Sequence, residues 1–140
     1  MTCALAINLV RASTRAAMLM QWPITVSTLA EAEFFAEAGF RDILYAVAMA
    51  PAKLARARRI RQELGAALLL LTDSTRLAEA AAGYDLDFLI EVDCGDRRGG
   101  LPPESPHLID VAKAIAAGGN RVRGVMTHAG HSYGTDDPEA

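Results

Sequence analysis

Short apolar runs alternate with helix-patterned segments along the chain from residue 24 onward. "ITVST" is rich in β-branched residues, and "AALLLLT" is an apolar run of strand length. The pattern predicts strands at 24–28, 42–49, 66–72, 87–95 and 122–128, and helices at 29–40, 51–64, 73–83 and 105–119. Strands joined through helices run parallel and need right-handed crossovers. We therefore predict an α/β fold of parallel strand–helix units, with helices over both faces of the sheet.

Start and stop signals mark the ends of the predicted helices. Thr28 immediately precedes the first helix, and Glu31 lies three residues after Thr28. This spacing is the pattern of a capping box. Gly39 is a natural C-terminal stop for that helix. Pro51 stands at the expected first position of the second helix. These signals agree with the hydrophobic periodicity.

Two architectures fit these units: a portion of a (β/α)8 barrel, or an open doubly wound sheet. Both place functional groups at the carboxyl ends of the strands. Polar residues follow the predicted strands in this chain too, at 72–73, 93–98 and 128–133. A complete barrel needs about 250 residues. A chain of 140 residues with five units would therefore form an incomplete barrel.

Composition and charge argue against several classes of function. A net charge of −3 gives no general electrostatic case for nucleic acid or an anionic membrane. The arginines within 53–61 are interpreted as a solvated helix face, because Leu54, Ala57 and Ile60 form the buried stripe. No apolar run approaches the roughly 20 residues that span a bilayer. The two cysteines form no CxxC pair, which favours a cytoplasmic location.

The first 22 residues do not share the strand–helix rhythm. Glu31 is the first acidic residue of the chain, and residues 11–22 are rich in Arg, Ser and Thr, as in an organellar transit peptide. An apolar stretch precedes these arginines, which is the wrong order for a secretory signal. A misplaced start is favoured over a transit peptide. We leave 1–22 unassigned and interpret 23–140 as the partial domain.

The segment "VDCGDRRGG" (92–100) is the most informative part of the sequence. A carboxylate at the end of a buried strand, followed by glycines and paired arginines, predicts a tight exposed loop. An arginine there would hold a carboxylate or phosphate through fork-like hydrogen bonds. A solvated turn is the alternative interpretation of the same residues.

Two histidines follow the last predicted strand. His128 and His131 stand three residues apart, with Asp136 and Asp137 close behind. Histidine and carboxylate side chains suit zinc or manganese. The spacing is not helical, and neither Cys nor Glu joins the group, so no metal site is predicted. His128 is interpreted as a histidine that lines a pocket.

Three segments together resemble a known enzyme family. "ITVSTLAEAEFFAEAGFRDILYA", "IEVDCGDRRGGLPP" and "GVMTHAGHSYG" are similar, in order and spacing, to segments of the D-threonine aldolase and D-serine dehydratase family. Its members share the alanine-racemase-type N-terminal barrel of the fold type III enzymes, which use pyridoxal phosphate. The similarity runs from about residue 24 to residue 134. It implies a (β/α)8 barrel followed by a β-rich C-terminal domain, and a dimer in many members.

The resemblance also implies roles for individual residues. The pattern D-x-G-x-x-R-x-G falls on Asp93, Gly95, Arg98 and Gly100. In such enzymes this arginine, here Arg98, bonds near the phenolic oxygen of the cofactor. The histidine that ends the matching strand packs against the pyridine ring, which points to His128. Tyr133 matches a tyrosine of the same cavity.

The chain departs from the family pattern in one important respect. Family members carry a lysine on an early strand that binds the cofactor covalently, and that motif is missing here. The chain has two lysines, Lys53 and Lys113, and both are predicted to lie on helices. The C-terminal domain, which carries the divalent-metal ligands in the family, is also expected to be absent. The resemblance thus implies an internal portion of a longer enzyme, with no catalytic residue and no metal ligand of its own.

We accordingly predict a fragment of a D-amino-acid lyase that is inactive alone. The intact enzyme would cleave D-3-hydroxy amino acids into glycine and an aldehyde, with the dehydratase and racemase reactions left open. The expected partners are a small D-amino acid and a second copy or complementing chain. The alternative is a non-catalytic α/β module, or half of a split protein, that associates with another chain through its open sheet edges.

Overall fold

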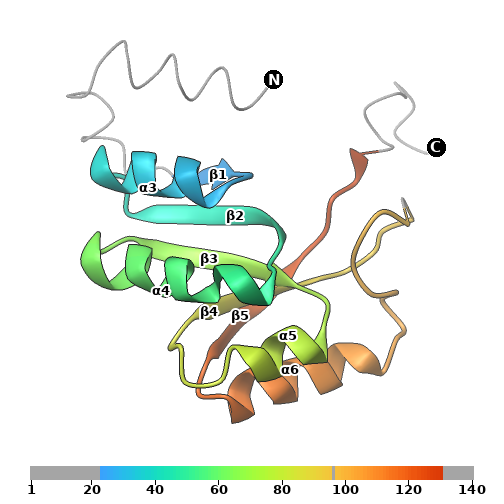
Figure 1. Cartoon of the computed structure of the whole chain (residues 1–140). Helices are drawn as coiled ribbons and strands as arrows, with labels where there is room; N and C mark the ends of the chain where they lie inside the picture. The colour runs from blue at the N-terminus through green and yellow to red at the C-terminus, as the bar shows by residue number, and fades with distance from the viewer. Residues whose placement is uncertain (1–22, 96, 131–140) are drawn as a thin grey trace.

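Strands and helices alternate in the order that the sequence predicts. The computed structural model describes residues 23–95 and 97–130 (Figure 1). The strands are β1 (Ile24–Val26), β2 (Asp42–Ala48), β3 (Ala67–Thr72), β4 (Asp87–Glu91) and β5 (Arg121–Met126). The helices are α3 (Leu29–Glu37), the 3-10 turn η1 (Pro51–Lys53), α4 (Leu54–Glu63), α5 (Thr75–Ala80) and α6 (His107–Ala117). Each of the nine predicted segments is confirmed, with ends that differ by a few residues.

The order of the strands decides between the two predicted architectures. All neighbouring strands pair in parallel, and the sheet order is β1-β2-β3-β4-β5, the same as the order along the chain. A doubly wound sheet reverses direction at a switch point, whereas a barrel adds each strand beside the last. The fold is therefore α/β, a partial barrel of the (β/α)8 type.

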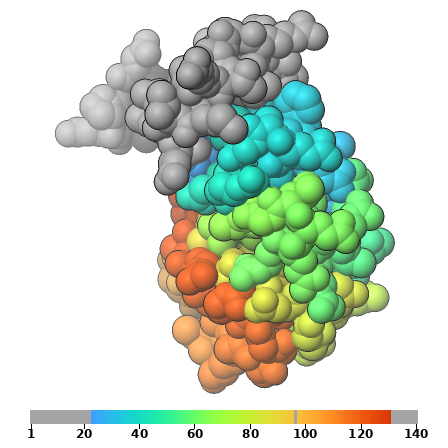
Figure 2. Space-filling view, turned by 90° about the vertical axis from the view of Figure 1, so that its left-hand side faces the viewer, coloured from blue at the N-terminus to red at the C-terminus, as the bar shows by residue number. Residues whose placement is uncertain are grey.

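The prediction that helices cover both faces of the sheet is wrong. Because the strands follow chain order, each right-handed crossover places its helix on the same side. Figure 1 shows α3 and α4 in front of the sheet, and α5 beside α6 at its lower end, which is the orange and yellow-green end of the molecule in Figure 2. The opposite face carries Leu44, Leu69 and Leu89, which are half-buried. That face lines the interior of a complete barrel.

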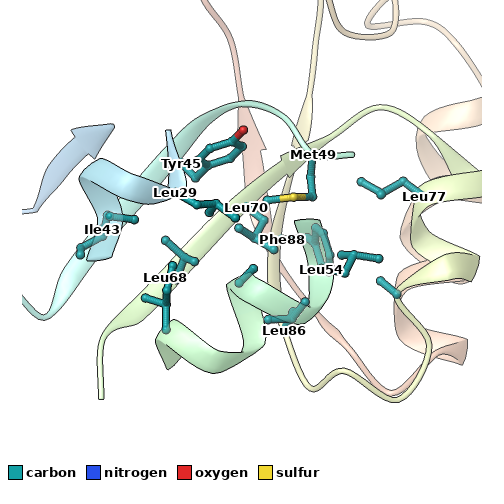
Figure 3. Close-up of a cluster of buried hydrophobic side chains, with 14 of the residues drawn as sticks. Leu29, Ile43, Tyr45, Met49, Leu54, Leu68, Leu70, Leu77, Leu86 and Phe88 are labelled. Carbon is teal, nitrogen blue, oxygen red and sulfur yellow. The ribbon is translucent and has the colours of Figure 1, made fainter. Parts of the chain in front are cut away.

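One hydrophobic core lies between the sheet and its helices. Alternate strand residues point into it, because successive side chains of a strand face opposite sides. These are Ile43, Tyr45, Leu68, Leu70, Phe88 and Ile90. Figure 3 shows Leu70 and Phe88, from neighbouring strands, close to Leu54 of α4, with Tyr45 farther along the same core. This core holds the strands in register and so sets the edge at which the strands end.

The capping box predicted for the first helix is confirmed. The hydroxyl of Thr28 accepts a hydrogen bond from the Glu31 backbone at 3.1 Å, and the Glu31 carboxylate accepts one from the Thr28 backbone at 2.9 Å. Gly39 has a φ of 99° just beyond the helix, a conformation that glycine adopts without steric cost. Local sequence signals therefore determine both ends of α3.

An ion network joins the elements at the amino end of the sheet. The buried carboxylate of Asp87, the first residue of β4, accepts hydrogen bonds from Arg61 of α4, from Arg121 Nε at 2.6 Å and from Arg123 Nε at 2.9 Å. Arg121 also contacts Asp85 through Nη1 at 2.5 Å. Burial opposes ionisation of Asp87, but the hydrogen bonds from Arg121 and Arg61 outweigh it and hold its pKa below the ordinary value. The network ties α4, β4 and β5 together at the edge where the strands begin.

Candidate functional site at the carboxyl edge of the sheet

Three neighbouring strands bring polar side chains to one edge of the sheet. Asp73 directly follows β3, Glu91 ends β4, and His128 lies two residues beyond β5. Glu91 pairs in register with Met126 of β5, so the ends of these two strands are level. The edge where these residues meet is the one that barrel enzymes use for catalysis.

The loop after β4 folds back onto the strand that precedes it. Val92 forms a parallel bridge with Leu101, in which the Leu101 backbone N–H donates to the Glu91 carbonyl at 3.0 Å. The Asp93 N–H in turn donates to the Leu101 carbonyl at 2.9 Å. These bonds confirm the predicted tight loop. They also bring both ends of the loop to the end of β4.

The side chain of Asp93 stabilises this loop by hydrogen bonds to its backbone. One of its carboxylate oxygens accepts hydrogen bonds from the backbone of Gly95 at 2.9 Å and of Arg97 at 3.0 Å. Such a bond from an Asp side chain to the backbone two residues on is the hallmark of an Asx turn. The aspartate of the D-x-G-x-x-R-x-G pattern is therefore committed to the shape of the loop that presents Arg98.

Gly100 lets the returning loop pass close to β4. Its φ is 89°, and a Cβ atom placed there would lie 2.7 Å from the backbone nitrogen of Asp93. The Gly100 N–H donates to the Asp73 carboxylate at 3.2 Å, which fastens the loop to the end of β3 as well. Any side chain at this position would push the loop away from the sheet.

Charged residues from several segments of this edge act on the Glu91 carboxyl. Burial raises the pKa of the half-buried Glu91 carboxyl, the charge of Asp73 raises it further, and the positive charges of Arg98 and His128 lower it. Arg98 and His128, both predicted from the sequence, are therefore near enough to this carboxyl to act on it by charge. Tyr133, the third predicted residue, lies outside the described residues.

Sequence reasoning did not single out Glu91. The signal was present, because a glutamate in the apolar run "DFLIEV" lies on the opposite face from Phe88 and Ile90, which enter the core. A charged residue at the end of a buried strand needs either solvent or a partner of opposite charge. Here the positively charged neighbours come from the loop after β4 and from the segment beyond β5, and only the fold brings them near Glu91.

Both lysines lie on helical segments, and neither contributes to the charges that act on Glu91. Lys53 Nζ donates to the hydroxyl of buried Tyr45 at 2.9 Å, and Lys113 is exposed on α6. Within residues 23–95 and 97–130, the structure contains no group of three or more His, Cys, Asp or Glu side chains arranged to hold a metal ion. His131, Asp136 and Asp137 fall outside those ranges. In the same part of the chain, no helix is long and apolar enough to cross a membrane.

Comparison with known proteins now places the chain. The profile of the alanine racemase N-terminal domain matches residues 5–140. The chain belongs to this family. The resemblance inferred from the sequence motifs is thereby confirmed, and with it the relation to fold type III dehydratases and aldolases that depend on pyridoxal phosphate.

Several relatives of this alanine racemase N-terminal domain have named activities or solved structures. D-threo-3-hydroxyaspartate dehydratase from Delftia sp. HT23 is 44% identical over 124 residues, which cover 84% of this chain and 32% of the dehydratase. Its structure superposes with a TM-score of 0.77. An alanine racemase-like protein from Idiomarina loihiensis is 39% identical, with a TM-score of 0.79 over 93% of this chain and 36% of that one. The 3-hydroxy-D-aspartate aldolase of Paracoccus denitrificans is 29% identical over 109 residues, or 73% of this chain and 28% of the aldolase. This domain therefore spans about a third of the length of these relatives.

Proposed function

We propose that this chain forms the cofactor-facing portion of a pyridoxal-phosphate-dependent lyase that acts on a D-3-hydroxy amino acid. The observation that carries the proposal is that the Arg98 loop and His128 lie at the same carboxyl edge of a partial barrel. The 44% identity to D-threo-3-hydroxyaspartate dehydratase supports the same reaction class.

The residues at this edge suit the groups that surround such a cofactor. Arg98 is exposed on a loop whose backbone is held in place, so its guanidinium is available to donate hydrogen bonds to an anionic oxygen. His128 is half-buried and offers a flat ring for an aromatic partner. Tyr133 is proposed as a third neighbour. When bound, the cofactor supplies an electron sink for charge that develops at the α-carbon of the substrate.

For the reaction itself we propose elimination of water from the 3-hydroxy amino acid, with a 2-oxo acid and ammonia as the final products after hydrolysis. The dehydratase relative is more similar to this chain than the aldolase relative, at 44% against 29% identity. Cleavage between the α- and β-carbons, with glycine and an aldehyde as products, is the second candidate, and the aldolase relative favours it. Product analysis separates the two reactions.

Completion of the site by further protein is part of this proposal. The two lysines of the chain lie on helical segments, and neither acts on Glu91, so the amine for covalent catalysis would come from another segment or another chain. In the described residues, β1 and β5 each have one edge without a neighbouring strand. We propose that added strands, from a complementing chain or a second copy, pair there in the cytoplasm. A non-catalytic module that uses the same edges is the alternative function.

Titration of the 140-residue chain with pyridoxal phosphate, followed by its visible absorbance, tests the cofactor role. We expect reversible binding that Arg98→Gln weakens about tenfold, because a hydrogen bond to a charged group is lost. Arg97→Gln is the matched control: it removes the same charge from the adjacent exposed position, and we expect a change smaller than about twofold. Equal effects of the two variants would contradict a specific role for Arg98.

Borohydride reduction of the same mixture, followed by mass spectrometry, tests the role of the lysines. We expect no one-to-one adduct on Lys53 or Lys113, since Lys53 is hydrogen-bonded to Tyr45 and Lys113 is exposed on an outer helix. A stoichiometric adduct on either residue would show that a displaced lysine serves the cofactor. Catalysis by this chain alone would then have to be measured.

A further inference from the structure

The turn after β3 is held in place by the two neighbours of Asp73. The hydroxyl of buried Thr72 accepts the Ser74 N–H at 3.1 Å. The Ser74 hydroxyl in turn accepts the Leu77 N–H at 3.4 Å and so caps α5. The Asp73 carboxylate accepts the N–H of Gly100 at 3.2 Å, a residue 27 positions farther along the chain. Asp73 therefore stands on a fixed turn and bonds to a distant element.

The returning limb of the loop after β4, residues 97–101, is attached to two strands by different kinds of bond. Leu101 bonds to β4 through its own N–H and carbonyl, so this attachment involves main-chain atoms alone. The attachment to β3 is the hydrogen bond from the Gly100 N–H to the Asp73 side chain. A main-chain bond survives most substitutions, whereas the attachment to β3 depends on which residue stands at position 73.

Arg98 lies between two points at which this limb is held. Before it, the Arg97 N–H donates to the Asp93 carboxylate at 3.0 Å. After it, the Gly100 N–H donates to Asp73. Two glycines follow Arg98 directly, and glycine has the greatest backbone freedom of all residues, so one path is kept only if bonds to other segments hold it. Loss of the Asp73 bond would loosen the limb on the side where these glycines lie.

We propose that Asp73 is a positioning residue, whose carboxylate fastens the returning limb to β3 and so fixes where Arg98 meets the cofactor. The role toward the cofactor rests on the proposed function. The fastening does not, because it is a hydrogen bond within this chain.

The charge of Asp73 gives the proposal a distinctive sign. Pyridoxal phosphate carries a negatively charged phosphate group. Removal of a nearby carboxylate would by charge alone favour its binding, whether alanine or asparagine replaces the aspartate. Loss of the fastening has the opposite effect and occurs with alanine only, because the side-chain oxygen of asparagine can still accept the Gly100 N–H.

Titration of the 140-residue chain with pyridoxal phosphate compares these variants. We expect Asp73→Ala to weaken binding about tenfold, because a hydrogen bond to a charged acceptor is lost. Asp73→Asn should stay within about twofold of the wild type, since it keeps the acceptor. Asp42→Ala, at an exposed aspartate of β2, is the matched control and should change the dissociation constant less than about twofold.

Nuclear magnetic resonance on the same variants needs no cofactor. In Asp73→Ala the Gly100 N–H should exchange with solvent about tenfold faster, whereas the Leu101 N–H, bonded to the main chain, keeps its wild-type rate. The order parameter of the Arg98 amide should fall from about 0.85 to below about 0.6. Asp73→Asn should restore both values.

These readouts separate failure of the proposal from failure of the proposed function. If the wild-type chain does not bind pyridoxal phosphate, the proposed function fails, and the Gly100 exchange rate and the Arg98 order parameter alone decide the role of Asp73. Unchanged values of these two in Asp73→Ala overturn it. Equal effects of alanine and asparagine on binding would assign them to charge and overturn it too. If Asp73→Ala does not fold, Asp73→Ser replaces it, because its hydroxyl is one bond shorter than the carboxylate oxygen.

Discussion

Gly100→Ala will lower the free energy of unfolding by about 3 kcal/mol, from backbone strain plus a steric clash. The φ of 89° is unfavourable for any residue with a Cβ atom. The new methyl would also lie 2.7 Å from the Asp93 nitrogen and 2.8 Å from the Val92 carbonyl carbon. Both are backbone atoms, so relief requires the loop to move away from β4. Urea unfolding followed by circular dichroism measures the loss.

Gly95→Ala is the matched control for this prediction. Gly95 lies in the same loop with a φ of 115°, but a Cβ atom placed there meets nothing within 4 Å. We expect it to lower the free energy of unfolding by about 1 kcal/mol, from backbone strain alone. Gly100→Ala should also weaken pyridoxal phosphate binding more than Gly95→Ala does, because it displaces the segment that carries Arg98. Similar losses for the two variants would mean that the close approach of Gly100 to β4 has no energetic importance.

Asp87→Asn will lower the free energy of unfolding by about 2–3 kcal/mol at neutral pH, near the lower end of the cost of removing one partner from a buried ion pair. The carboxylate is buried and accepts hydrogen bonds from Arg61, Arg121 and Arg123, whereas the amide that replaces it carries no charge. The three arginines are partly exposed, so water compensates some of the loss. Thermal and urea denaturation both measure this effect.

The same variant should show a defined pH dependence. Because the pKa of Asp87 lies below its ordinary value of 3.8, its carboxylate contributes fully to stability above that pH. The contribution disappears as the pH falls through the lower pKa of the folded state. The difference in unfolding free energy between wild type and Asp87→Asn should therefore be constant from pH 7 to about pH 5 and shrink below about pH 4.

Asp42→Asn is the matched control for the ion network. Asp42 is the first residue of β2, as Asp87 is of β4, but it is exposed. We expect its substitution to change stability by less than about 0.5 kcal/mol, as is usual for an exposed position. An equal loss at Asp42 and Asp87 would show that the charge at the start of a strand matters in general, and that the arginine network does not.

The elements of this fold follow from local sequence. The β-branched and apolar runs, the Thr28 capping box and Gly39 each act within a few residues, and all of them appear in the structure as predicted. The family could also be recognised from its motifs. Residues of these motifs such as Asp93 and Gly100 shape the loop after β4 through contacts with residues close to them in sequence. All of these features depend on residues that are close together in the sequence.

The features that the sequence left open all depend on contacts between distant segments. Whether the units form a barrel or a doubly wound sheet depends on which strands become neighbours, and periodicity within one strand carries no information about the next. In the sequence, Asp87 is an ordinary aspartate at the start of a strand. In the fold it binds Arg61 of α4 and Arg121 and Arg123 of β5. The charges that act on Glu91 likewise come from segments that are distant in sequence.

The sequence by itself thus determined the alternation of strands and helices, the helix ends, the loop after β4 and the family, because short-range periodicity, capping and turn chemistry encode them. Only the tertiary structure decided the strand order, the single helical face, and the placement of Asp73, Glu91 and His128 at one edge of the sheet. The physical reason is that burial and charge depend on which side chains are neighbours in space. That is settled only when parallel strands dock in register and their carboxyl ends reach a common edge.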